Sequence, residues 1–362
     1  MKGKTKTKHG EAVKWLAIVL AVLAAVGCFA TLIPRKAEPP PVFETYGSDV
    51  DVVKINTLTD AIEGTITAAS CANGMYFTAI ETSGLTKLLV SNNGSSWTNV
   101  LDHPSTADLL PWDGIIDEIV YVNSTWFFGF QSFDTISDGM VFRFRPDSGD
   151  NSGLGGDWQA SFDGRSYGSG RATAMDVIGG TLYLVTENGH LFRKTSGGAW
   201  YLVNESVPTP FAGYRVFDIA KCGDTYLALG EDASGSVLFT ARAMTGTWTV
   251  QRLSTKANRF DTTDSACFIA CDNGTFLYTE DFENWKTSRM PDNVSFTEFF
   301  VYGGNHYAVG INEEIGVVYE STNGGASWER VAETDEPLVA VSVGSNEALL
   351  YGEDGGIFRL TK

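Results

Sequence analysis

The stretch Ser321-Thr-Asn-Gly-Gly-Ala-Ser-Trp328 comes directly after the apolar run Gly316-Val-Val-Tyr319. A second stretch, Ser91-Asn-Asn-Gly-Ser-Ser-Trp97, has nearly the same form after Leu88-Leu-Val90. Asn and Gly accept the positive backbone φ angles of a tight turn, and an apolar strand before the turn with Trp after it is typical of a β-hairpin. Each stretch therefore predicts a hairpin whose Trp packs on a sheet.

The Trp residues that come after such turns form one repeating series, spaced by 37 to 61 residues: Trp97, Trp158, Trp200, Trp248, Trp285 and Trp328. A second series consists of short Gly- and Asn-rich turns between apolar runs, at residues 71–76, 122–126, 178–183, 222–226, 271–276, 302–307 and 343–347. A repeat of about 40 residues is typical of propellers and solenoids. We expect each turn of the second series to join the inner two strands of one repeat.

The last repeat has only three candidate strands, and no Trp strand comes after them. Residues 50–55 form an apolar strand near the other end of the chain, with no repeat of their own. An open ring would leave strand edges unpaired, which favours aggregation. Pairing of residues 49–57 with the last repeat removes both edges. The sequence thus predicts an all-β fold over residues 49–362, a seven-bladed β-propeller with four-stranded antiparallel blades closed by the N-terminal strand. Six or eight blades, or an array of β-sandwiches, are the alternatives.

The chain has 362 residues and a net charge of −18, although the first 14 residues hold five lysines and one glutamate. Proteins that bind nucleic acid use lysine and arginine to neutralise phosphates. Nucleic acid is therefore not an expected partner of so acidic a chain.

Residues 15–33 are uncharged and mostly apolar. As a helix they would extend about 28 Å, close to the thickness of a bilayer's hydrocarbon core. With residues 1–14 as a basic cytoplasmic leader, the positive-inside rule predicts a single-pass anchor that exports the remainder of the chain. Residues 34–48 form a Pro-rich spacer. A lipoprotein signal ending at Cys28 and a cleaved signal peptide are the two alternatives.

The two opening stretches resemble the Asp-box, or bacterial neuraminidase repeat, with Asn in place of Asp. The residues that carry the resemblance are Ser91, Asn93, Gly94 and Trp97 in one stretch, and Ser321, Asn323, Gly325 and Trp328 in the other. Sialidases, sortilin-like proteins and photosystem II assembly factors share this repeat on propeller folds. The resemblance implies that the box lies between the third and fourth strands of a blade, away from the ligand face, with a structural role.

A sialidase would also need three arginines that bind the substrate carboxylate, a Tyr nucleophile with its Glu, and an Asp acid/base. The Phe/Tyr-Arg-Ile-Pro motif usual in that family is missing, and Tyr214-Arg-Val-Phe217 matches only half of it. We therefore expect a non-enzymatic binding or assembly module outside a membrane. A sialidase-like hydrolase with a diverged site and a virion- or envelope-associated structural protein are the alternatives.

The links between successive blades surround one mouth of a propeller channel, which makes them the expected ligand face. Here they correspond to residues 101–114, 160–171, 203–214, 253–263 and 289–295. The candidate ligand-binding residues are Trp112, Tyr167, Arg171, Tyr214, Arg215 and Arg259. Arginines there would hold an anionic group and aromatic rings would stack on a sugar or a peptide of a protein or glycan ligand. Alternatively, the arginines pair with nearby acids such as Asp176, Asp218 and Asp261, and the rings fill gaps between blades.

No cofactor or metal site is predicted. The four histidines are scattered, and Cys267 and Cys271 lie too far apart on one strand to form a disulfide. The loop from Asp147 to Asp157 is rich in carboxylates, but its spacing fits no EF-hand, which leaves a calcium site and a solvated insertion both open.

Overall fold

The computed structural model describes residues 49–58, 64–83, 85–100, 114–132, 140–148, 154–164, 166–195, 198–262, 266–272, 274–282, 284–290 and 294–362. The predicted leader, membrane segment and spacer (residues 1–48) lie outside these ranges. Among the described residues, no helix combines the length and the apolar composition that crossing a membrane requires.

The described residues form seven antiparallel sheets, each of four strands, which we number as blades in chain order. Blade 1 contains β2 (Thr65–Ala72), β3 (Met75–Thr82), β4 (Leu85–Ser91) and β5 (Thr98–Asn99), and blade 2 contains β6 (Gly114–Val122), β7 (Thr125–Ser132), β8 (Met140–Pro146) and β9 (Gly156–Asp163). Blade 3 contains β10 (Ala172–Ile178), β11 (Thr181–Thr186), β12 (Leu191–Lys194) and β13 (Trp200–Leu202). Blade 4 contains β14 (Arg215–Cys222), β15 (Thr225–Asp232), β16 (Gly235–Ala241) and β17 (Thr249–Arg252). Blade 5 contains β18 (Ala257–Thr262), β19 (Cys267–Cys271), β20 (Thr275–Thr279) and β21 (Lys286–Arg289). Blade 6 contains β22 (Ser295–Tyr302), β23 (Asn305–Asn312), β24 (Ile315–Ser321) and β25 (Glu329–Thr334). Blade 7 contains β26 (Leu338–Val343), β27 (Ala348–Gly352), β28 (Gly356–Thr361) and β1 (Asp51–Thr57).

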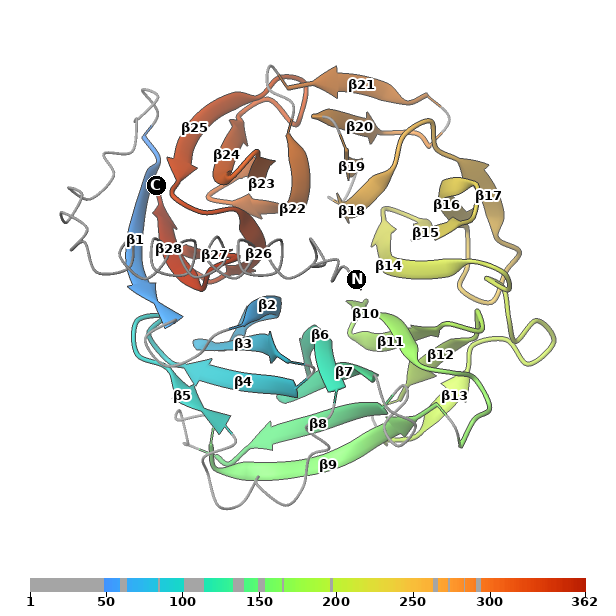
Figure 1. Cartoon of the computed structure of the whole chain (residues 1–362). Helices are drawn as coiled ribbons and strands as arrows, with labels where there is room; N and C mark the ends of the chain where they lie inside the picture. Colours follow the sequence, from blue (N-terminus) through green and yellow to red (C-terminus); the bar gives the residue numbers. More distant parts are fainter. Residues whose placement is uncertain are drawn as a thin grey trace, which may run out of the picture. The chain divides into compact units, whose positions relative to one another are not determined.

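The N-terminal strand closes the ring. β1 pairs antiparallel with β28, from Asp51 opposite Thr361 to Thr57 opposite Gly356, and so supplies the fourth strand of blade 7. Figure 1 shows β1 in blue beside the red strands of the last blade, with the seven sheets arranged around a central axis. The predicted seven-bladed propeller, its four-stranded blades and its closing strand are confirmed.

Among the described residues the hydrophobic core is divided into seven clusters, and each cluster lies in the seam between two neighbouring blades. The Trp of each of the first six blades belongs to the seam with the preceding blade, as Trp97 does against Tyr351 and Trp200 does against Phe162. The seam between blades 6 and 7 has no Trp in its cluster, and Val50 and Val52 of the closing strand are buried there. The Trp series therefore marks seams, and the closing strand explains why it has one member fewer than the blades.

Every blade carries a β-bulge between its first and second strands. One residue of the first strand is inserted at this point in each blade: Thr67, Asp117, Thr173, Phe217, Asn258, Thr297 and Val339. A bulge places two consecutive residues opposite one and turns their side chains away from the usual alternation. The backbones approach closely here, since a Cβ on Gly310 would lie 2.4 Å from the carbonyl oxygen of Ser295. The bulges therefore determine which side chains reach the channel.

One hairpin of the predicted series has a different place in its blade. The turn at residues 271–276 joins the second and third strands, β19 and β20, whereas the other six turns join the first and second strands. In blade 5 the first and second strands, β18 and β19, are connected by residues 263–266, whose sequence contains no Gly or Asn.

The closing strand provides a direct test of the fold. We expect Val52→Asp to lower the free energy of unfolding by about 3 kcal/mol, because it buries a carboxylate in the seam between blades 6 and 7. Val52 is 8% exposed, whereas its neighbour Val53 on the opposite face of β1 is 47% exposed. Val53→Asp is the matched control and should change stability by less than about 0.5 kcal/mol in urea titrations. Equal losses in the two variants would contradict a closing role for the buried face of β1.

Candidate functional site

A cavity of about 330 Å³ occupies the channel and is lined by residues from the first strand of all seven blades. Six carboxylates border it: Asp117, Glu118, Asp176, Asp218, Asp261 and Glu298. Blades 7 and 1 contribute mainly small and apolar side chains, including Ala68 and Ala340. The acidic half of the lining therefore comes from blades 2 to 6.

Four of the six carboxylates belong to first-strand positions at or next to a bulge. Asp117 is the inserted residue of blade 2 and Glu118 is the next residue, so the bulge brings two adjacent acids to the channel. Asp218 and Glu298 come directly after the inserted residues of blades 4 and 6. A regular strand would send adjacent residues to opposite faces.

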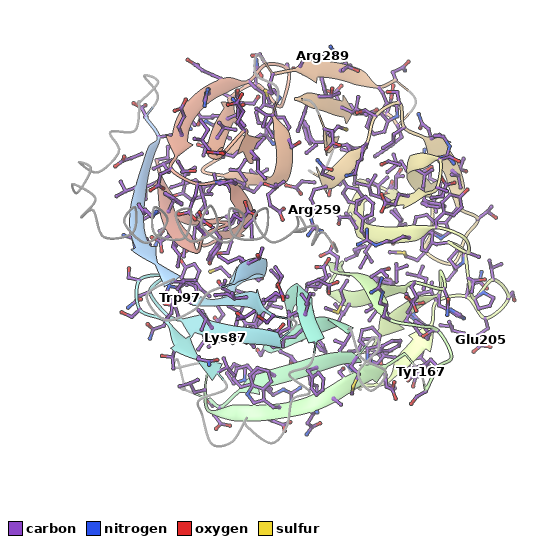
Figure 2. The ribbon with its side chains drawn as sticks, in the orientation of Figure 1. Lys87, Trp97, Tyr167, Glu205, Arg259 and Arg289 are labelled. Carbon is purple, nitrogen blue, oxygen red and sulfur yellow. The ribbon has the colours of Figure 1, made fainter. Side chains whose placement is uncertain are left out.

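Arg259 is the cation of this group, and Figure 2 shows it near the centre of the ring. Its guanidinium lies 3.7 Å from Glu118 Oε1 and 3.6 Å from Glu298 Oε1, and Nη1 donates to the carbonyl of Phe217 at 3.5 Å. Glu298 most strongly raises the pKa of Arg259 above its usual value, with further contributions from Glu118 and Asp218. Arg259 is thus a fixed positive charge that links acids from blades 2 and 6.

Burial raises the pKa of every channel carboxylate. It raises the pKa of Asp117, Asp218 and Asp261 to about 7 each. The pKa of Asp176 is raised to about 6, and the pKa values of Glu118 and Glu298 are also raised by burial, although Arg259 opposes the shift. The protein around the channel solvates an anion less well than water does, and the acids repel one another. Several of these carboxyl groups therefore titrate near neutral pH.

The mouth at the N-terminal ends of the first strands holds a second cavity of about 320 Å³. Arg215 and Arg259 both line it, together with Phe217, Lys256 and Glu231. The structure thus brings two of the three candidate arginines to one cavity.

Each candidate arginine has a carboxylate partner. Arg171 Nε lies 3.1 Å from Glu187 Oε2, and Arg215 Nη1 lies 3.1 Å from Glu231 Oε1. Glu187 and Glu231 are not among the aspartates that the sequence suggested, whereas Asp218, which is one of them, interacts electrostatically with Arg259. The three arginines nevertheless share one neighbour, since the positive charges of Arg171, Arg259 and Arg215 all lower the pKa of Asp117 against the effect of burial.

The blade links differ from their predicted bounds. The link expected at 253–263 ends earlier, because β18 begins at Ala257, and Arg259 therefore lies within the first strand rather than at its start. Arg215 is the first residue of β14, and Arg171 directly precedes β10.

The candidate aromatic residues pack against the blades. Tyr167 stacks on Phe162 with ring centroids 5.1 Å apart and remains half exposed, at the periphery of the ring in Figure 2. Tyr214 packs edge-on against Phe239 at 5.1 Å in the seam between blades 3 and 4. Neither tyrosine lines the channel or mouth cavity, and Trp112 lies outside the described residues.

The two opening stretches form tight turns between third and fourth strands. In the first, Ser91 Oγ accepts a hydrogen bond from Gly94 N at 2.9 Å, and Trp97 Nε1 donates to the carbonyl of Gly94 at 3.2 Å. In the second, Ser321 Oγ accepts from Gly325 N at 2.8 Å, and Asn323 Oδ1 accepts from Ser327 N at 3.0 Å. Trp328 Nε1 donates to the carbonyl of Gly325 at 3.2 Å.

A third turn, ahead of Trp285, shares part of this hydrogen-bond pattern, although Trp285 Nε1 donates to Gln251 Oε1 at 3.3 Å and not to a carbonyl of the turn. Thr279 Oγ1 accepts from Phe282 N at 2.9 Å, and Asp281 Oδ1 accepts from Asn284 N at 2.7 Å. Phe282 takes the place of the turn glycine at a φ of 61°. The signal was Thr-x-Asp ahead of Trp285, in which Thr replaces Ser and no glycine is present.

Two Tyr–Glu pairs occur in the described structure, but neither meets the arginines in one cavity. Tyr76 donates to Glu347 Oε1 at 2.9 Å, and Tyr307 donates to Glu320 Oε1 at 2.6 Å. Burial, and then the glutamate hydrogen bond, raises the pKa of each tyrosine above its usual range. A tyrosine nucleophile requires easier deprotonation, so these environments work against one.

Among the described residues, no group of three or more His, Cys, Asp and Glu side chains is arranged to hold a metal ion. The loop considered for calcium lies partly outside them, at residues 149–153. Cys71, Cys222, Cys267 and Cys271 are free thiols, as expected from the spacing of the last two.

The channel carboxylates predict a pH dependence. Folded Asp261 holds its proton up to about pH 7, whereas the unfolded chain releases it near pH 4, so the folded state binds more protons between these values. Stability therefore falls as pH rises through this window. Because Asn cannot ionise, the stability of Asp261→Asn relative to wild type should increase from about pH 4 to about pH 7 in urea titrations. Asp224→Asn, at an exposed position, is the control, and its stability relative to wild type should not increase over this pH range. An equal increase in Asp224→Asn, or no increase in Asp261→Asn, would contradict the raised pKa of Asp261.

No protein-family model and no curated protein sequence matches this chain. Its fold is similar to that of virginiamycin B lyase from Staphylococcus aureus, with 11% identity and a TM-score of 0.63 over 87% of this chain and 100% of that chain. YCF48 from Cyanidioschyzon merolae aligns with 13% identity and a TM-score of 0.58 over 87% of this chain and 99% of that chain. BBS1N, solved in complex with ARL6DN, aligns with 12% identity and a TM-score of 0.59 over 86% and 96% of the two chains. At these identities the likeness concerns the fold alone: the described chain is a seven-bladed β-propeller.

Proposed function

We propose that this protein is a non-enzymatic binding or assembly module that recognises a protein or glycan ligand at the mouth near Arg215. The observation that carries the proposal is the mouth cavity, which opens beside the channel and is lined from blades 2 to 5. A rigid ring that presents side chains from several blades at one point is suited to recognition.

The mouth cavity combines groups that bind different parts of a ligand. Arg215 keeps 51% of its side chain exposed beside the ring of Phe217, and Lys256 is exposed nearby. Glu231 supplies a carboxylate, held 3.1 Å from Arg215. Arginine and aromatic side chains are the residues that most often dominate the binding energy of protein interfaces.

The charges below the mouth favour a particular ligand. The channel carboxylates make the interior negative, whereas Arg215 and Lys256 make part of the rim positive. A ligand that carries both signs of charge matches this arrangement better than a neutral sugar does. We therefore favour a peptide segment of a partner protein with a basic side chain directed toward the channel, and a glycan as the other ligand to test.

The comparison structures support a binding role to the extent that BBS1N was solved in a complex, although they also include a lyase. The Ser91 and Ser321 turns resemble the Asp-box, which occurs in sialidases as well as in non-enzymatic propellers, so they favour neither class. In this proposal the turns hold blades together and the mouth at the other end binds the ligand.

We further propose that residues 15–33 anchor the protein in a membrane, with the propeller on the extracytoplasmic side. The uncharged segment and the five lysines before it support this topology. The anchor would hold the propeller at a membrane surface.

Binding at the mouth is tested with peptide and glycan arrays probed with the full chain in detergent. We expect a ligand whose affinity Arg215→Ala weakens about tenfold or more, because the variant removes a half-exposed guanidinium from the cavity. Arg252→Ala is the matched control: Arg252 is 44% exposed and also pairs with an acid, Asp232, but lies on the outermost strand of the same blade. If the ligands bind Arg215→Ala and Arg252→Ala as tightly as they bind wild type, the mouth is not the binding site. Arg259→Ala is less informative, since it leaves Glu118 and Glu298 without their cation.

The anchor is tested by membrane fractionation and alkaline carbonate extraction. Deletion of residues 15–33 should move the protein to the soluble fraction, whereas Cys28→Ser should leave it in the membrane if the apolar helix is the anchor. Release of Cys28→Ser from the membrane would instead favour a lipid anchor at that cysteine.

A further inference from the structure

A cavity of about 330 Å³ lies in the seam between blades 2 and 3. The turns that join the first two strands of these blades, at Asn123 and Gly180, form part of its wall. These turns are at the C-terminal ends of the first strands, so this cavity and the mouth cavity lie at opposite ends of the propeller. The function proposed for the mouth does not involve it.

Three cationic side chains from two blades meet at this cavity. Arg143 and Arg145 are two residues apart on β8 and share the face directed toward blade 3, where Arg143 lies opposite Phe127. Lys194 on β12 faces back toward blade 2, with its Nζ over the ring of Phe127. Arg193 also lies at the wall, but it is opposite Tyr183 and shares that residue's face, toward blade 4.

Lys194 is held in an unusual environment for a lysine. Its Nζ lies 5.6 Å from the ring centroid of Phe127 and 5.0 Å from that of Trp200, and it donates to the carbonyl of Gly198 at 2.6 Å. Burial, and then the positive charge of Arg143, lowers the pKa of Lys194 to about 8. A cation in this position gains stability from an anion beside it.

The described lining of this cavity contains no Asp or Glu. The acid that contacts its cations is Asp157 on β9, with its carboxylate 3.7 Å from Arg143 Nη2. Gln159 donates to both Asp157 oxygens at 2.9 Å and accepts a hydrogen bond from Arg143 Nη2. Asp157 also lies opposite Arg145 in the register of β8 and β9, so its single negative charge offsets only part of the charge of the two arginines.

The positive lining is a property of these residues and not of the fold. The seam between blades 1 and 2 has a comparable cavity of about 430 Å³ at the same end of the propeller. That cavity is lined by neutral side chains such as Asn73, Asn92 and Tyr121, and by Asp147. In a chain with a net charge of −18, three cations around one cavity require a specific explanation.

We propose that the cavity between blades 2 and 3 binds a tetrahedral oxyanion, the phosphate or sulfate group of a small molecule, through Arg143, Arg145 and Lys194. Guanidinium groups bind such oxyanions with two parallel hydrogen bonds, and a lysine adds a compact charge. Asn123, Thr181 and Thr195 are polar residues that also line this cavity.

Sulfate is the first probe, because its charge is constant across neutral and alkaline pH. We expect saturable sulfate binding to the full chain in detergent by calorimetry. Lys194→Met, which keeps the apolar stem over Phe127 and Trp200, should weaken binding about tenfold or more, and Arg145→Gln should act in the same direction. Sulfate affinity of wild type should fall as pH rises through about 8, where Lys194 loses its proton.

Lys194→Arg is the informative second variant. A guanidinium stays charged above pH 8, so this variant should retain sulfate binding and lose the decline at alkaline pH. Lys286→Met is the matched control, because Lys286 also lies over an aromatic ring, Tyr278 at 4.9 Å, but has Glu280 as a partner. It should bind sulfate like wild type, as should Arg215→Ala, which separates this site from the mouth.

Inorganic phosphate and acetate complete the test. Phosphate should compete with sulfate, and acetate should not at equal concentration, because a planar carboxylate engages fewer of the converging donors. Any of three results would overturn the proposal. Neither sulfate nor phosphate binds saturably, wild type and Lys194→Met bind sulfate equally well, or acetate binds as tightly as sulfate.

Discussion

In the first strand of every blade, one inserted residue interrupts the pairing with the second strand, and the channel depends on this constraint. The inserted residue also connects blades. Thr67 donates to the carbonyl of Ile116 at 2.6 Å, Asn258 to that of Phe296 at 2.7 Å, and Thr297 to that of Leu338 at 2.8 Å, each in the next blade. Since the residue after the insertion then faces the channel, the same distortion that joins neighbouring blades also presents Glu118, Asp218, Arg259 and Glu298.

The molecule separates its charges by location. Carboxylates from blades 2 to 6 gather in the channel around Arg259, whereas Arg143, Arg145 and Lys194 gather in a seam. Both groupings oppose stability, because like charges repel and burial penalises the charged form. The seven apolar seams offset that cost, and Trp and Phe rings supply much of the buried area in them. Unfavourable charge groupings maintained in a stable scaffold are typical of binding sites.

The sequence predicted the fold well because the fold depends on local patterns that recur. Turn residues next to apolar strands identified the blades, and the unpaired strand at 50–55 identified the closure. The site was harder to predict, since side-chain direction in the first strands depends on the bulges, and a bulge leaves no separate mark in the sequence. Asp117-Glu118 and Asp218 interrupt apolar strands, which was a detectable sign of the channel acids. Arg143 and Lys194 are about 50 residues apart in the chain, and only the packing of two blades brings them together.

The pairing of β1 with β28 also has a consequence for how the protein is made. These strands stand at opposite ends of the described chain, with Val52 opposite Leu360. Because the ribosome adds residues in order, β1 emerges before the other described strands and β28 after them, so six blades can form while blade 7 remains incomplete. During that interval β1 presents an unpaired edge with the buried-type residues Val50 and Val52, which is a site for chaperone capture or for pairing with another chain. Closure of the ring is therefore a long-range strand addition, which its contact order makes slow, and the yield of closed rings depends on protecting that edge until β28 has been made.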